Sequence, residues 1–398
     1  MEVLIRSGDT LSYYSQLFMV PLQLILDANP KVIEEDLQIE KKIVIPGFQS
    51  VPYTIRSGET LSNLAASRNL SIDAIKLLNQ TEDFDHLTIK EPILLPERII
   101  KPYSQTARAY GYKTLKEATS YLKRVYPFIT VTPIGSSVLG NSIEEIRVGK
   151  GAKKIHMNAS FHANEWITTL VLMHLLNNYL LALTNSTPLR GVDCLKLYQN
   201  VELSIVPMVN PDGVDLVLYG PRAEQREMIL KMNDNQDDII HWKANIRGVD
   251  LNNQYPAKWE IEKQRKVPKS PAPRDYPGDL PLTEPEAIAM AELVKKNPFD
   301  CMIAFHTQGE EFYWGYEGHE PVEAEAIAKE FEQESGYQAI RYIDSHAGFK
   351  DWYIQEFKRP GFTIELGRGI NPLPLSMFND IYKRAEGIFA AALKFKLV

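Results

Sequence analysis

A strand-to-helix junction near the middle of the chain constrains the fold more than any other feature. The sequence from Lys153 to Leu176 reads KKIHMNASFHANEWITTLVLMHLL. Ile155–Ser160 is typical of a buried strand, and the apolar run Ile167–Leu183 is typical of a helix. Because His174 and two asparagines interrupt that run, we interpret it as a buried core helix and not as a membrane span. A buried strand feeding a buried helix indicates an α/β sheet.

Two polar side chains at this junction are candidates for binding a metal ion. His162 and Glu165 are three residues apart, so both can reach one ion from the same face of a turn. Catalytic zinc takes three ligands from histidine and carboxylate groups and leaves a fourth position for water. An HxxE pattern alone is common, but open α/β sheets place their sites at the carboxyl ends of buried strands. The position of the pair therefore favours a zinc site.

A third ligand is expected from the end of another strand. Cys301–Phe305 is an apolar run followed directly by His306, which makes this imidazole the best remaining candidate. Four other histidines are expected to be solvated or structural: His86, His156, His174 and His319.

A carboxylate in a third short strand is the candidate general base. The segment Gly361–Leu366 reads GFTIEL, and its only charge is Glu365. A buried acid is costly without a partner. Two interpretations remain open: Glu365 faces the metal as a base for the attacking water, or it pairs with Arg368.

Composition excludes several functional classes. The 398 residues carry 44 basic and 51 acidic side chains, a net charge of −7, which gives no basic face for nucleic acid or anionic lipid. Only Cys194 and Cys301 are present, which excludes a disulfide scaffold and a cysteine-only zinc site. The N-terminus lacks the pattern of an export signal. We therefore expect a cytoplasmic protein, or one that meets wall material in a specialised state such as sporulation.

The first hundred residues contain a duplication. Ile5–Leu11 reads IRSGDTL and Ile55–Leu61 reads IRSGETL, fifty positions later. The similarity continues through LILDANP and AIKLLNQ to IVIPG and ILLPE. Self-similarity at a fixed period indicates tandem units, here each a strand, a turn, two helices and a strand. The turns are expected to use the positive φ of glycine and a threonine cap, at Gly8, Thr10, Gly58 and Thr60.

These landmarks resemble the LysM module, a βααβ unit that binds glycans containing N-acetylglucosamine. The alternative is a small α/β repeat of unrelated use. The boundaries would be residues 1–48 and 51–98, with a short joint at 99–106. The resemblance implies glycan-binding positions at the first turn and the last loop of each module: Gly8, Asp9, Thr10, Asn29 and Ile45 in the first, and Gly58, Glu59, Thr60, Asn79 and Leu95 in the second.

Residues 107–398 resemble the zinc carboxypeptidase family of the carboxypeptidase A and B type. The ordered matches are HANEW, NPDG (210–213), GVDLN (248–252), TEPEA (283–287), FHT and TIEL. Thr283 and Glu286 in TEPEA also predict a capping box. The resemblance implies an α/β/α sandwich around a mixed, largely parallel eight-stranded sheet. It also implies one zinc ion held by His162, Glu165 and His306, with Glu365 as base and then acid.

The same resemblance implies a substrate pocket, and the chain departs from the family pattern there. The pocket would include Asn252, Thr307 and the mobile tyrosine, here Tyr342. The family's Asn-Arg pair is Asn252-Asn253 in this chain, so we infer that a free α-carboxylate at the usual place is not required. The cation that polarises the scissile carbonyl would be either Lys243 or Arg247.

Together these features resemble the bacterial γ-D-glutamyl-L-diamino acid endopeptidases, which cleave peptidoglycan stems before diaminopimelate or lysine. Lys350, just before Asp351-Trp352, would favour an anionic leaving residue if buried, or would be a solvated lysine if exposed. The alternatives are a carboxypeptidase acting on muropeptides, a deacylase, or a non-catalytic wall-binding protein. The proline-rich stretch 256–281 either shapes the cleft rim or is a solvated surface loop.

Overall fold

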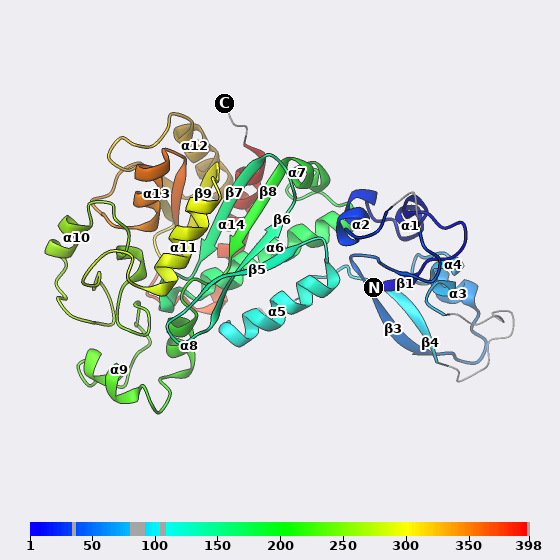
Figure 1. The fold of residues 1–398 in the computed structure, drawn as a ribbon, viewed down its shortest axis with the longest axis horizontal. Coiled ribbons are helices and arrows are strands. Elements are labelled where there is room, and N and C mark those ends of the chain that lie inside the picture. The colour runs from blue at the N-terminus through cyan, green and yellow to red at the C-terminus, as the bar shows by residue number, and fades with distance from the viewer. Residues whose placement is uncertain (34–36, 80–91, 104–108, 396–398) are drawn as a thin grey trace. The chain divides into compact units, whose positions relative to one another are not determined.

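The computed structural model describes residues 1–33, 37–79, 92–103 and 109–395 (Figure 1). His86, the end of the predicted joint and the first residues of the predicted peptidase region lie outside these ranges. By spatial contact the chain divides into two units. One comprises Met1–Tyr103, Thr119–Thr130 and Asn177–Lys196, and the other comprises Ser104–Ala118, Val131–Leu176 and Leu197–Val398.

The first unit contains both repeats, and each has the predicted order of elements. The first repeat consists of β1 (Glu2–Leu4), α1 (Leu11–Phe18), α2 (Leu22–Ala28) and β2 (Lys42–Val44). The second consists of β3 (Phe48–Thr54), α3 (Leu61–Ala66), α4 (Ile72–Lys76) and β4 (Pro92–Arg98). The strands pair antiparallel within each repeat. This confirms the predicted βααβ arrangement.

Turn chemistry explains why the two repeats fold alike. Gly8 and Gly58 both have φ of +82°, a backbone conformation that favours glycine. The hydroxyl of Thr10 accepts a hydrogen bond from the Tyr13 N–H at 3.0 Å, and Thr60 accepts from Asn63 at 3.2 Å. Both predicted helix caps are therefore present, and they start α1 and α3 at equivalent positions.

The second unit is built on an eight-stranded mixed sheet, as predicted. Its order is β11-β10-β12-β9-β7-β8-β6-β5. The strands are β5 (Thr130–Ser136), β6 (Ser142–Val148), β7 (Lys153–Ala159), β8 (Val201–Val206), β9 (Cys301–His306), β10 (Glu311–Tyr313), β11 (Gln338–Ile340) and β12 (Gly361–Glu365). The central strands β8, β7, β9 and β12 run parallel, so their carboxyl ends share one edge of the sheet.

Helices and 3₁₀ turns connect these strands. The helices are α5 (Tyr112–Val125), α6 (Ile167–Asn185), α7 (Cys194–Asn200), α8 (Pro211–Tyr219), α9 (Arg226–Met232), α10 (Trp259–Arg265), α11 (Pro285–Lys296), α12 (Glu323–Ser335), α13 (Phe349–Phe357) and α14 (Phe378–Lys394). The 3₁₀ turns are η1 (Ala163–Glu165), η2 (Leu251–Asn253) and η3 (Leu375–Met377).

The sheet is covered on both faces, which gives the predicted sandwich (Figure 1). On one face α11 and α13 pack their apolar side chains around Met302 and Ala304 of β9. Helix α6 lies on the other side, where His174 packs against Phe378 of α14. The stretch 163–185 is long and apolar enough to cross a membrane, but 89% of its most apolar window is buried inside the protein. It is the predicted core helix.

One predicted cap is wrong. Helix α11 begins at Pro285 with Glu284 as its N-cap, and no side chain caps it, so Thr283 and Glu286 do not form a capping box. Instead the carboxylate of the buried Glu286 accepts a hydrogen bond from the Val138 N–H at 3.0 Å. The acid holds the turn after β5 against α11, a tertiary contact that the local TEPEA pattern does not reveal.

Candidate metal centre and active site

Three segments far apart in the sequence deliver their side chains to one edge of the sheet. His162 is the N-cap of η1, the turn that follows β7, and Glu165 ends that turn. His306 is the last residue of β9, and its register partner on β12 is Glu365. Because directly paired residues of neighbouring strands point to the same face, His306 and Glu365 share a face at the carboxyl edge.

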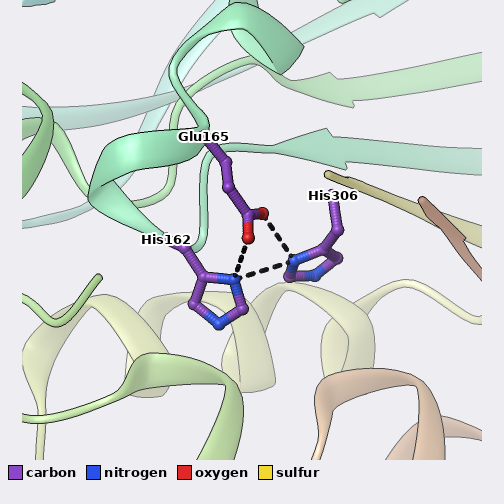
Figure 2. Close-up of side chains that lie close together, drawn as sticks. All are labelled: His162, Glu165 and His306. Atoms are coloured by element: carbon purple, nitrogen blue, oxygen red, sulfur yellow. Dashed lines mark hydrogen bonds and ion pairs between the residues drawn. The ribbon is translucent and has the colours of Figure 1, made fainter. Parts of the chain in front are cut away.

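Figure 2 shows His162, Glu165 and His306 turned toward one another. The Nδ1 atom of His162 is 2.8 Å from Glu165 Oε1, and His306 Nδ1 is 3.0 Å from Oε2. The two Nδ1 atoms are 3.1 Å apart. A tetrahedral zinc site with bonds of about 2.1 Å has ligand–ligand edges of roughly 3.4 Å. The three donor atoms therefore have nearly the spacing that zinc requires, and this buried group could hold a metal ion.

The hydrogen bond of His162 on its other side supports the same conclusion. Its Nε2 lies 3.2 Å from Oδ1 of the fully buried Asp250. When Nε2–H donates to that carboxylate, the Nδ1 lone pair faces a carboxylate oxygen and a second imidazole nitrogen. Converging electron pairs of this kind are favourable around a cation. Asp250 also fixes the orientation and basicity of the imidazole, as carboxylate partners of metal-binding histidines do.

Charges around the group are strongly coupled. Burial alone would raise the pKa of Glu165, but the two imidazoles lower it to about 2. Burial raises the pKa of Glu365 to about 8, and the Glu165 carboxylate adds to that increase. Arg368 is exposed and its ion pair is with Glu310, so the pairing of Arg368 with Glu365 is wrong. Glu365 instead lines the cleft beside His162 and Glu165.

The cleft has a volume of about 400 Å³. Its lining includes residues of the segments around Lys243 and Arg274 and of the segment 343–351. Predicted site residues that line it are His162, Glu165, Lys243, Asn252, Thr307, Lys350 and Glu365.

The structure separates the two candidate cations. Lys243 lines the cleft, and its Nζ atom lies 3.4 Å from Asp250. Burial alone would lower the pKa of Lys243, but Asp250, Glu165 and Asp275 raise it, so the side chain is charged. The Arg247 side chain is 53% exposed and pairs with Glu284 at 3.6 Å, away from the cleft lining. Of the two candidates, Lys243 is therefore the one that lines the cleft.

Some of the predicted substrate residues line the cleft and others do not. Asn252 lines the cleft and accepts a hydrogen bond from the Phe349 N–H at 3.0 Å. Thr307 lines it too, with its backbone N–H 3.3 Å from Glu165 Oε2. Asn253 is buried outside the lining, and its carbonyl accepts from Trp259 Nε1. Tyr342 is half-exposed, and its hydroxyl donates to Glu320 at 2.7 Å instead of entering the cleft.

Lys350 is buried, so the solvated-lysine interpretation is wrong. Its ammonium lies 2.7 Å from Asp351 Oδ1 and donates to the Gly315 carbonyl at 2.9 Å. Both Lys350 and Asp351 line the cleft. That wall therefore presents a cation and an anion side by side.

The loop 256–281 shapes the cleft rim. It contains α10, and Arg274 lines the cleft. The interpretation of this stretch as a plain surface loop is therefore wrong at Arg274.

Two of the positions implied for glycan binding in each repeat have structural roles. The side-chain amide of Asn29 donates to the Ile25 and Val44 carbonyls and accepts from the Val44 N–H, each at 2.8 Å. Asn79 repeats this pattern in the second repeat. Ile45 and Leu95 are fully buried, so their side chains cannot contact a glycan.

The turn carboxylates are also held by the protein. Asp9 accepts hydrogen bonds from the Arg6 N–H and from the Tyr14 hydroxyl. Glu59 accepts from the corresponding Arg56 N–H and from Tyr53. Arg6 further donates to both oxygens of Asp73, at 2.8 and 2.7 Å, which links the first turn to α4 of the second repeat. Gly8, Thr10, Gly58 and Thr60 remain exposed at the turn surfaces.

Comparison with known proteins fits this geometry. The model of a family described as zinc carboxypeptidase matches residues 115–384, more than half of the chain. The chain belongs to the zinc carboxypeptidase family. Residues 3–46 and 53–96 each match the LysM domain, so the two repeats are LysM domains.

Individual proteins are similar to this chain over different shares of its length. This zinc carboxypeptidase family member is 49% identical to gamma-D-glutamyl-L-diamino acid endopeptidase 1 of Lysinibacillus sphaericus, covering 99% of this chain and all of the relative. It is 51% identical to the uncharacterized protein YqgT of Bacillus subtilis, over 72% of this chain and 78% of that protein. Bovine thrombin-activatable fibrinolysis inhibitor has a similar fold, with a TM-score of 0.57 at 19% identity, covering 73% of this chain and 98% of that one.

Three residues in or directly behind the peptidase cleft are not predicted by the sequence. Asp250 lies within the GVDLN motif, and its signal was a lone acid next to an apolar residue in a buried segment. Asn371 accepts a hydrogen bond from the Thr307 hydroxyl at 2.7 Å, but nothing in its sequence surroundings indicates this contact. Arg274 was one of several charges in a long loop.

Proposed function

We propose that this protein is a zinc-dependent peptidoglycan hydrolase that cleaves the bond between a γ-D-glutamyl residue and the diamino acid that follows it in stem peptides. The observation that supports this most is the buried group of His162, Glu165 and His306 beside Glu365. The relative named for this activity extends over both the LysM domains and the peptidase region. The LysM domains would hold glycan that carries the stems.

The ligand set fits one zinc ion in the peptidase domain. A bound zinc ion would supply Lewis-acid chemistry at the scissile carbonyl and at the attacking water. His162, Glu165 and His306 would hold it, with Asp250 orienting His162.

Glu365 performs the proton transfers in this proposal. Its carboxylate takes the proton from the attacking water and then donates it to the nitrogen of the departing amine. Burial and the nearby Glu165 carboxylate raise its pKa, and a raised pKa favours the protonated form that the second step requires. The Lys243 ammonium at the same cleft places positive charge where the carbonyl oxygen becomes negative.

The wall at 343–351 would receive the diamino acid. Lys350 and Asp351 form a buried ion pair there, so a leaving residue with polar groups at its far end would find partners of both signs. Diaminopimelate and lysine are both candidates, and defined stem peptides distinguish them. Cytoplasmic location stays a prediction, which cell fractionation tests.

The decisive experiment compares wild type with Glu365→Gln on defined tri-, tetra- and pentapeptide stems, with products read by mass spectrometry. We expect wild type to release the diamino acid segment, and Glu365→Gln to lose turnover by at least about a thousandfold while keeping its zinc. Glu356→Gln, an exposed substitution on α13, serves as the matched control and should remain active.

The same assay separates the rival functions. A wild-type protein that binds zinc and glycan but cuts no stem would be a non-catalytic wall-binding protein. Removal of a terminal residue only, with blocked stems left intact, would indicate a carboxypeptidase. Full activity in Glu365→Gln would contradict the assigned base.

A further inference from the structure

The geometry points to Arg274 as a specificity-determining residue that binds the free α-carboxylate of the γ-D-glutamyl residue. This inference rests on the proposed function and identifies the part of the substrate that one wall of the cleft recognises. A γ-linkage leaves the α-carboxyl group of glutamate outside the peptide bond, so the acyl side of the scissile bond carries a negative charge. A cation on that side of the cleft would therefore add affinity and selectivity.

The backbone around Arg274 is fixed to the segment that carries the catalytic cation. The carbonyl of Pro273 accepts hydrogen bonds from the N–H groups of Lys243 and Ala244 at 2.8 and 2.9 Å. On the other side, the carbonyl of Tyr276 accepts from the Asp250 N–H at 2.7 Å. Arg274 therefore lies between two anchored residues, next to Lys243 and to the carboxylate that orients His162.

The side chain of Arg274 remains available to a ligand. It is 61% exposed, and its Nε donates to Asp275 at 3.1 Å. Within the described part of the chain, its two Nη groups make no hydrogen bond. A guanidinium with two free N–H edges is suited to bidentate binding of a carboxylate.

Arg274 shares its carboxylate partner with two other cations. Asp275 is shared by three cations, because Lys243 and Lys266 lie 3.9 and 3.5 Å from it in addition to Arg274. One carboxylate cannot neutralise three cations. Lys243 and Lys266 each have a second carboxylate, Asp250 and Glu262, and Arg274 has none among the described residues. Among the described residues, Arg274 is therefore the one cation of the three that pairs with Asp275 alone.

A second part of the cleft lining would receive the other half of the substrate. Ile343, Ser345, Gly348, Lys350 and Asp351 line that wall, and the metal-binding group and Glu365 line the cleft as well. With the diamino acid on the 343–351 wall, the glutamyl residue extends toward Lys243 and Arg274. The α-carboxylate carbon lies four bonds from the scissile carbonyl carbon, roughly 5 Å in an extended chain, so it stays within the cleft.

The test pairs one substitution in the protein with one in the substrate. Stem peptides with γ-D-glutamate are compared with γ-D-isoglutamine peptides, in which the α-carboxylate is an amide. We expect wild type to prefer the free acid in kcat/KM. Arg274→Gln should lower kcat/KM for the free acid by about ten- to a hundredfold and change the amide substrate by less than about threefold. Lys269→Gln, on the same loop, is the control and should change neither.

The outcomes distinguish this inference from the proposed function. Equal losses on both substrates, or a preference that survives in Arg274→Gln, would overturn the role of Arg274 while leaving the hydrolase intact. If Arg274→Gln instead loses selectivity for a carboxylate on the diamino acid, the assignment of Arg274 to the glutamate carboxylate would be overturned as well. If wild type cleaves neither peptide, the proposed function itself fails.

Discussion

Asp250→Asn tests how the protein prepares its metal-binding group. Asp250 is fully buried and has three contacts: His162 Nε2 at 3.2 Å, the Asn252 N–H at 3.0 Å and Lys243 Nζ at 3.4 Å. Asparagine preserves the shape of the side chain but removes its charge. With its oxygen toward His162, its amide nitrogen would face the Lys243 ammonium. The variant therefore loses both the polarisation of the imidazole and a favourable ion pair.

The expected loss is in zinc affinity. Substitution of a carboxylate partner of a metal-binding histidine weakens metal affinity by about ten- to a hundredfold, which corresponds to about 1.4 to 2.7 kcal/mol. Because two donors would be forced together beside Lys243, we expect Asp250→Asn near the upper end of this range.

Competition with a chromophoric chelator measures this directly on the full chain. Asp275→Asn is the matched control, because Asp275 also pairs with Lys243, at 3.9 Å, but is not hydrogen-bonded to His162. It should change zinc affinity by less than about threefold. The reasoning is refuted if Asp250→Asn binds zinc within twofold of wild type, or if both variants weaken binding equally.

Two further substitutions test structural roles. Burial raises the pKa of Glu286 to about 7, above the ordinary value of 4.5, so its contribution to stability is present below pH 4.5 and is lost as pH rises through 7. The free energy of unfolding of Glu286→Gln, measured in urea, should therefore rise relative to that of wild type by roughly 3 kcal/mol between pH 4.5 and pH 8. A difference between the two proteins that does not change with pH would contradict this. Asn29→Ala removes three side-chain hydrogen bonds, two to Val44 of β2 and one to Ile25 of α2. Amide exchange there should therefore accelerate at least about tenfold, unlike in the exposed control Gln16→Ala. Equal exchange in the two variants would count against the structural role of Asn29.

The metal-binding group could be predicted because its signals are local. His162 lies just after the apolar strand β7, Glu165 is three residues further in the same turn, and His306 ends β9. The carboxyl ends of parallel strands meet at one edge. The register that pairs His306 with Glu365 then follows from the sheet. No long-range information beyond strand order was required.

The residues that sequence could not place depend on tertiary contacts. Lys243 and Arg247 are four residues apart in one loop, and only the packing of that loop turns one into the cleft and the other toward Glu284. Ile45 follows a strand and was assigned to a surface groove, yet it fills the core of its domain. Glu286 has the spacing of a cap but is captured by a distant N–H group.

Anomalous diffraction at the zinc edge, on crystals of the full chain grown with zinc, tests the central claim most directly. The account predicts one strong peak bonded to the Nδ1 atoms of His162 and His306 and to the Glu165 carboxylate, with Glu365 beside it. A peak held by other residues, or none at this position in zinc-replete crystals, would contradict it.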